Sequence, residues 1–224
     1  MNEYRRYALY YTPPEGALAD FGAGWLGWDI ASGRAVAQPV AAVPELDAIT
    51  ATPRKYGFHA TLKPPFRLAA GAAAEAVLRA ARDLARSLSP AEADGLRLDR
   101  IGPFLALVAG GDNTALNRLA AATVTRLDHL RAPLTEAEFS RRAPGRLSPR
   151  QRELLDRWGY PYVLDEFRFH MTLTGALGEA QLSRVEAALT KILPPMPQPF
   201  TIDAISLVGE GADGRFRLIE RLPL

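Results

Sequence analysis

The chain has 224 residues, enough for one substantial core or for two small lobes that share a cleft. Hydrophobic residues make up 48% of it, which excludes a disordered protein, and the net charge of +2 leaves any preference for anions to local clusters of Lys and Arg. There is no cysteine, so disulfides, thiolate metal sites and cysteine nucleophiles are excluded.

Hydrophobic periodicity and turn residues predict alternating strands and helices. The expected strands cover 7–11, 56–62, 96–101, 104–108, 167–174, 200–208 and 214–220. The expected helices, with apolar residues at helical spacing, cover 72–88, 113–130, 148–158 and 179–193. The third of these has a clear start signal, because Ser148, Pro149 and Gln151 form a capping-box pattern. The region before Thr52 reads as a short helix plus loop.

A short pattern occurs twice, as His59-Ala60-Thr61-Leu62 and as His170-Met171-Thr172-Leu173, and it contains two of the three histidines. Alternate side chains of a strand share a face, so each His lies on the same face as its Thr, roughly 6.5 Å along the backbone. Two such pairs facing one another would surround a small anion with two titratable groups and two hydroxyl donors. This indicates acid–base chemistry at a phosphate.

The order of elements around the two motifs is also repeated. Each motif strand precedes an amphipathic helix and then a hairpin, in which Asp99 and Asp203 fall at matching places. We therefore expect an internal duplication within one domain, with two pseudo-symmetric lobes that bring both motif strands beside a central cleft. The expected bounds are 1–224 for the domain, about 55–110 and about 165–222 for the repeats, and about 133–160 for a helical insertion.

The strings around the motifs, Tyr-Gly-Phe-His-Ala-Thr-Leu-Lys-Pro-Pro-Phe at 56–66 and Phe-Arg-Phe-His-Met-Thr-Leu-Thr-Gly at 167–175, resemble the two-histidine phosphoesterase superfamily. They look like a bacterial branch named for phosphonate metabolism, because its genes often lie beside carbon–phosphorus lyase genes. The resemblance covers nearly the whole chain. It implies a duplicated, bilobal α+β fold, with two antiparallel sheets flanking a central cleft and helices on the outer faces. It also implies phosphodiester chemistry without a metal or other cofactor.

Only the residues at the motif positions are assigned roles from this resemblance. It implies that His59 and His170 act as base and acid, in either order. Thr61 and Thr172 are then donors that hold the phosphoryl oxygens between the two rings. His129 has no flanking motif and reads as an ordinary surface residue near the end of a helix.

Strand parity adds further candidates for substrate binding. Lys63 shares a face with His59, and Arg168 shares a face with His170, so each either contacts phosphate or faces solvent. Tyr56 either stacks on a base or sugar or packs against the core, and the same holds for Trp158, Tyr160 and Tyr162. The densest basic run is either a lid over an anionic substrate or a solvated helix face, and consists of Arg141, Arg142, Arg146, Arg150 and Arg152.

The expected ligand is a small phosphorylated metabolite or a nucleotide, and a ribose derivative from phosphonate breakdown is implied by the resemblance only. Two alternatives stay open: RNA end processing or ligation at a 2′,3′-cyclic phosphate or 2′–5′ bond, and a nucleotide-binding module without turnover. RNA binding is permitted by the charge but not indicated. No His-Glu-x-x-His pattern and no glycine loop followed by Lys-Ser/Thr occurs. We expect a cytoplasmic protein without membrane contact, and the sequence does not indicate its oligomeric state.

Overall fold

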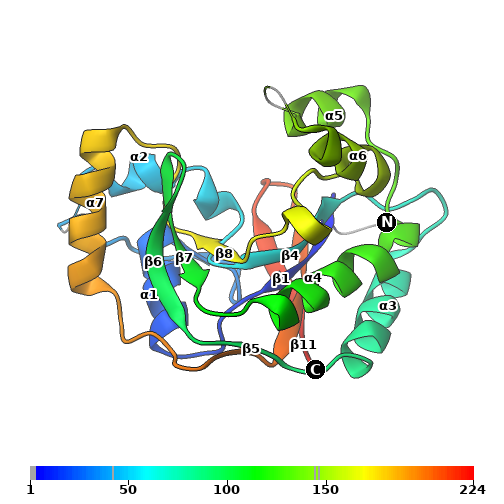
Figure 1. Cartoon of the computed structure of the whole chain (residues 1–224), viewed down its shortest axis with the longest axis horizontal. Helices are drawn as coiled ribbons and strands as arrows, with labels where there is room; N and C mark the ends of the chain where they lie inside the picture. The colour runs from blue at the N-terminus through cyan, green and yellow to red at the C-terminus, as the bar shows by residue number, and fades with distance from the viewer. Residues whose placement is uncertain (1–3, 42, 144, 146) are drawn as a thin grey trace.

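A seven-stranded sheet is the centre of the molecule (Figure 1). The structure is a computed structural model that describes residues 4–41, 43–143, 145 and 147–224. The strand order is β11-β10-β1-β4-β8-β7-β6, and each neighbouring pair is antiparallel. The strands of this sheet are β1 (Tyr7–Tyr11), β4 (Ala60–Phe66), β6 (Leu96–Ile101), β7 (Phe104–Ala109), β8 (His170–Thr172), β10 (Ala204–Glu210) and β11 (Phe216–Pro223).

The two motif strands are neighbours in this sheet, since β4 pairs with β8 at Ala60 and Met171. The expectation of two sheets flanking a cleft is therefore wrong. Strands that meet edge to edge satisfy each other's backbone hydrogen bonds, whereas two separate sheets would expose two additional edges. The remaining strands form two short ribbons, in which β2 (Trp28–Asp29) pairs with β3 (Arg34–Ala35) and β5 (Ala91–Ala93) pairs with β9 (Phe200–Ile202).

The helices with strong apolar periodicity lie close to their predicted positions. They are α3 (Ala74–Arg86), α4 (Thr114–Arg126), α6 (Pro149–Trp158) and α7 (Glu179–Ile192), and α6 has the predicted capping box between Ser148 and Gln151. Shorter helices not resolved by the periodicity are α1 (Ala17–Leu26), α2 (Leu46–Thr50) and α5 (Glu136–Arg142), with 3₁₀ turns at Pro53–Lys55, Asp128–Leu130 and Leu164–Glu166. In the described part of the chain, no helix is both long and apolar enough to span a membrane.

Strand β4 begins later than predicted and continues through Pro64 and Pro65 to Phe66. Its pairing with β1 shifts by one residue, because Tyr10 lies opposite Thr61 while Leu9 lies opposite Lys63. This is a β-bulge, in which one extra residue reverses the faces of the side chains that follow, until a second register shift between Leu9 and Tyr7. The prolines are tolerated because β8 is short and leaves this end of β4 with one neighbouring strand.

The arrangement above the sheet separates two groups of elements. Figure 1 shows α5 and α6 standing on one side of β8, while the β6–β7 hairpin and α7 lie on the other side. The largest hydrophobic core takes buried residues from both predicted repeats, including Leu62, Leu107, Met171 and Leu207. A smaller cluster of Val124, Leu154 and Val163 packs α6 against α4. The motif strands thus pack on a core that both predicted repeats share. Helices α5 and α6 rise above the sheet on one side of these strands, and the β6–β7 hairpin and α7 do so on the other (Figure 1).

Candidate active site

The strand register brings the four motif side chains together. Because Ala60 lies opposite Met171 in an antiparallel pair, the continued register places Thr61 opposite His170 and His59 opposite Thr172. Side chains directly opposite one another have Cβ atoms about 4.5–5.5 Å apart, and diagonal neighbours are about 7–8 Å apart. All four side chains line one cavity of about 390 Å³.

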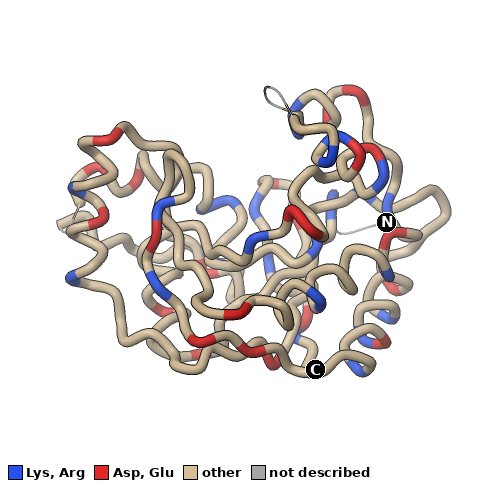
Figure 2. Tube along the Cα trace, in the orientation of Figure 1, with Lys and Arg blue, Asp and Glu red and all other residues tan. Residues whose placement is uncertain are grey.

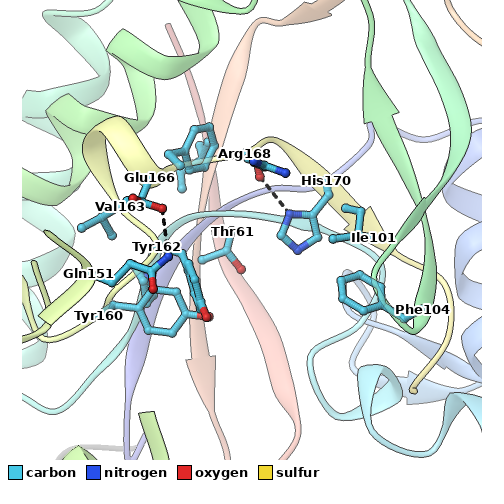
Figure 3. A pocket seen from close by; sticks show the side chains of 13 residues that line it. Thr61, Ile101, Phe104, Gln151, Tyr160, Tyr162, Val163, Glu166, Arg168 and His170 are labelled. Atoms are coloured by element: carbon cyan, nitrogen blue, oxygen red, sulfur yellow. Dashed lines mark hydrogen bonds between the residues drawn. The ribbon is translucent and has the colours of Figure 1, made fainter. Parts of the chain in front are cut away.

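Both imidazoles are held in the same way. His59 Nδ1 lies 2.8 Å from the carbonyl oxygen of Gly57. His170 Nδ1 lies 2.8 Å from the carbonyl oxygen of Arg168, as Figure 3 shows. A carbonyl oxygen only accepts, so each Nδ1 carries the hydrogen and each neutral ring has an unprotonated Nε2. The Thr61 hydroxyl donates to His59 Nε2 at 3.0 Å.

Gly57 is needed for this geometry. Its φ is +73°, in the left-handed region, and a Cβ at this position would lie 2.6 Å from Ile30 Cβ. Only glycine therefore allows the chain to turn here and direct its carbonyl oxygen at His59. This explains the glycine two residues before the first histidine.

The two histidines differ in their surroundings. The ring of Tyr10 stacks on His59, with centroids 3.8 Å apart and planes inclined by 26°. Burial lowers the pKa of His59 to about 4, and the nearby charge of His170 acts in the same direction, whereas the Gly57 carbonyl opposes both. His59 is therefore neutral at pH 7, with the lone pair of Nε2 available to accept a proton.

An apolar pocket of about 450 Å³ adjoins this cavity and shares Thr61, Tyr160 and His170 with it. Figure 3 shows Thr61 and His170 between two walls, with Tyr160, Tyr162 and Val163 on one side and Ile101 and Phe104 on the other. Gln151 donates to Glu166 at 3.1 Å at the edge of this pocket. The arrangement can hold a small organic group beside a phosphate.

The structure places Lys63 away from the cavity. Its side chain is 2% exposed, and Nζ donates to the Val124 carbonyl at 3.0 Å and lies 3.5 Å from an Asp128 carboxylate oxygen. Burial lowers the pKa of Lys63 to about 8. The expected phosphate contact of Lys63 is wrong, because the bulge between Thr61 and Lys63 reverses the parity on which it depended. The other two candidates, Arg168 and Tyr56, do line the pockets.

The basic run divides into two groups. Arg141 and Arg142 line the cavity with the histidines. Arg150 pairs with Asp165 and Glu153, and Arg152 pairs with Asp156, so these two belong to a solvated helix face. Arg146 lies outside the described residues.

Three polar residues of the cavity, Arg6, Tyr10 and Glu138, were not predicted from the sequence. Tyr10 lies in β1 with its ring against His59, and Arg6 directly precedes this strand. The spacing of four residues between Arg6 and Tyr10 is the signal that would place them on one face of an extended chain. Trp158 lines neither pocket and packs in the cluster between α4 and α6.

Charges are mixed over the rest of the molecule. Figure 2 shows basic and acidic positions interspersed along the trace, in keeping with the net charge of +2. Within the described residues, no group of three or more His, Cys, Asp and Glu side chains is placed so that it could hold a metal ion.

The sequence comparisons place the chain in a family. The model of the family described as "Protein of unknown function (DUF1045)" matches residues 61–217, which include the whole second motif and Thr61 and Leu62 of the first. The chain belongs to this family. Two curated relatives of this family member are both called "Ribose 1,5-bisphosphate phosphokinase PhnN". The protein from Janthinobacterium sp. (strain Marseille) is 40% identical over 218 residues, and the protein from Laribacter hongkongensis (strain HLHK9) is 39% identical over 188 residues.

These matches cover 93% and 79% of this chain but 48% and 42% of the two relatives. The family member described here thus spans about half the length of the curated relatives it matches. Both relatives are named as enzymes that act on a phosphorylated sugar.

Proposed function

We infer that the chain is a metal-independent phosphodiesterase that hydrolyses a small cyclic or linear phosphodiester. The observation that supports this most is the placement of two His and two Thr side chains on one face of neighbouring strands, around one cavity. A phosphodiester needs a base for the nucleophile, an acid for the leaving oxygen and donors for the nonbridging oxygens. The four motif side chains supply each of these.

The environment of the histidines suggests their roles. His59 is neutral with an unprotonated Nε2, so it accepts a proton from the attacking water. His170 lies diagonally across the strand pair from His59 and, in its protonated form, donates a proton from Nε2 to the leaving oxygen. Thr61 and Thr172 donate to the phosphoryl oxygens, and Thr61 leaves His59 Nε2 when it does so. Each histidine contributes on the order of a hundred- to ten-thousandfold to the rate.

The substrate is proposed to be a small ribose or nucleotide derivative. Cavities of about 390 and 450 Å³ suit a small molecule, and the names of the two relatives concern a ribose bisphosphate. The link to phosphonate breakdown rests on the resemblance of the motif strings. RNA end processing is the alternative within the same chemistry, and it requires a longer basic groove than these two pockets provide.

The relatives' name favours a second candidate, transfer of a phosphoryl group to a ribose bisphosphate. The name applies to proteins about twice as long, and this chain contains no glycine loop followed by Lys-Ser/Thr to hold a nucleoside triphosphate. Hydrolysis by the histidine pair is therefore the proposal that the described residues support better.

The test is an assay of nucleoside 2′,3′-cyclic phosphates and linear diesters, in EDTA, with wild type and with His59→Asn, His170→Asn and His129→Asn. His129 lies in a 3₁₀ turn, lines neither pocket, and is the matched control. We expect a loss of at least a hundredfold in the first two variants and none in the third. Activity that disappears with EDTA, or that survives in both site variants, would contradict the proposal. An arm with ATP and ribose 1,5-bisphosphate tests the kinase candidate.

A further inference from the structure

The cavity that holds the motif side chains extends to a second group of cations. Arg141 and Arg142 lie at the end of α5 and line the same cavity as His59 and His170. Figure 1 shows α5 raised above the central strands, so these arginines approach from a different element than the histidines do. Neither arginine belongs to the two motifs.

Arg142 is a half-buried arginine whose hydrogen-bond partners are backbone carbonyl groups. Its guanidinium donates to the carbonyl oxygens of Gly159 and Pro65 and, among the described residues, forms no ion pair. A guanidinium has five N–H donors and stays charged at any physiological pH, so donors and a full charge remain available. Burial of a cation without a counter-ion is unfavourable, and a bound anion would relieve it.

Two acidic side chains lie in or next to this cavity, and both are neutralised by other arginines: Glu138 lines the cavity, and Glu210 contacts the lining residue Arg6. Glu210 pairs with Arg6 at 2.6 and 2.7 Å, and Glu138 pairs with Arg67 at 2.8 and 2.9 Å. Arg141 forms no ion pair within the part of the chain that the structure describes. Two positive charges, those of Arg141 and Arg142, therefore remain uncompensated beside the histidine pair.

Two tyrosines, Tyr10 and Tyr160, line the same cavity. Tyr10 is fully buried, and its phenol oxygen has no hydrogen-bond partner among the described residues. Burial raises the pKa of Tyr10 well above its usual value and also raises that of Tyr160, so both keep their protons and act as donors. Arg142 also lies over the Tyr160 ring at 5.9 Å.

We propose that Arg142 and Arg141 form a second anion subsite, which binds a phosphate monoester on the same substrate whose phosphodiester lies between His59 and His170. The inference rests on the proposed function and names its substrate class, a phosphodiester that also carries a terminal phosphate. A phosphate monoester has a charge close to −2 near pH 7, which matches the two free cations. Its three terminal oxygens accept from a guanidinium and from hydroxyls at the same time.

The experiment compares two substrates that differ only in the terminal phosphate, a nucleoside 2′,3′-cyclic phosphate with a 5′-hydroxyl and the same compound with a 5′-phosphate. We expect wild type to turn over the 5′-phosphorylated compound with kcat/KM about 10- to 100-fold higher, the range that one or two charge-assisted hydrogen bonds provide. Arg142→Met should remove most of this preference and Arg141→Met should reduce it. Arg152→Met is the matched control, because Arg152 pairs with Asp156 and does not line the cavity.

Because Arg142 also ties α5 to two carbonyl groups, the ratio between the two substrates is the decisive readout. Equal losses for both substrates in Arg142→Met would show a structural role and overturn the assignment. So would the absence of a 5′-phosphate preference in wild type, or an equal preference for a 5′-carboxylate analogue. If neither compound is hydrolysed, the proposed function fails. The existence of the subsite is then tested by measuring the affinities of the same two compounds by calorimetry. Equal affinity with and without the 5′-phosphate would overturn the subsite itself.

Discussion

At the scale of single residues, two near-identical motifs are made unequal by their surroundings. Each histidine directs Nδ1 at the carbonyl oxygen two residues earlier. Only His59 lies against a buried tyrosine ring, and its pKa is lowered to about 4 by burial and by the charge of His170. The motif alone leaves the base and the acid interchangeable, because burial depends on β1, which is far from either motif in the sequence.

This difference predicts the pH dependence of the reaction. If His59 is the base, its neutral form is required, and a folded-state pKa of about 4 keeps that form populated until the pH falls through about 4. With a cyclic diester that does not titrate in this range, kcat/KM should therefore decline near pH 4 and not near 6.5. NMR titration of the three histidine rings, assigned with His129→Asn, measures the same pKa directly. An acid limb near pH 6.5 that coincides with protonation of His59 would contradict the assignment.

At the scale of elements, periodicity finds the helices but not the local irregularities that decide the site. The apolar stripe of α3 and the capping box of α6 are local signals, and both elements lie where the sequence predicts. The bulge in β4 depends on pairing with β1, which no local pattern shows, so the side of Lys63 was predicted wrongly. Arg142 was one of five similar arginines, and only the position of α5 over the sheet separates it from the others.

Helix α1 supports the first motif through one close contact, and this can be tested. A Cβ at Gly22 would lie 1.9 Å from the ring of Phe58, the residue before His59, while a Cβ at Gly24 would meet nothing within 4 Å. Gly22→Ala should therefore lower the free energy of unfolding by about 1–3 kcal/mol, as overpacking of a core does, and reduce turnover by displacing His59. Gly24→Ala, on the same helix, should raise the free energy of unfolding by up to ~1 kcal/mol. Urea unfolding and diester turnover measure both, and equal behaviour of the two variants would contradict the packing argument.

At the scale of the whole molecule, the two predicted repeats contribute strands to one sheet and side chains to one main core, and do not form two separate units. Each motif strand is followed by a helix, a short strand and a hairpin, and the matching strands pair with each other, β4 with β8 and β5 with β9. Such pairing between equivalent elements is what a pseudo-two-fold duplication predicts. The sequence indicated the repeated order, but which edges join is a long-range choice that its local patterns do not encode.

This shared structure predicts that the repeats unfold together. One sheet crosses both, and the main core contains buried residues from both, so neither repeat can lose its packing without exposing the other. Trp25, which precedes both repeats in the chain, is tied to the second one, because its indole nitrogen donates to the carbonyl of Leu173, the last residue of the second motif, at 2.8 Å. In Trp158→Phe, where Trp25 and Trp28 are the remaining fluorophores, urea transitions followed by fluorescence and by far-UV circular dichroism should coincide in midpoint and slope. Two separate transitions would instead indicate lobes that fold independently, with the histidine pair assembled at an interface between them.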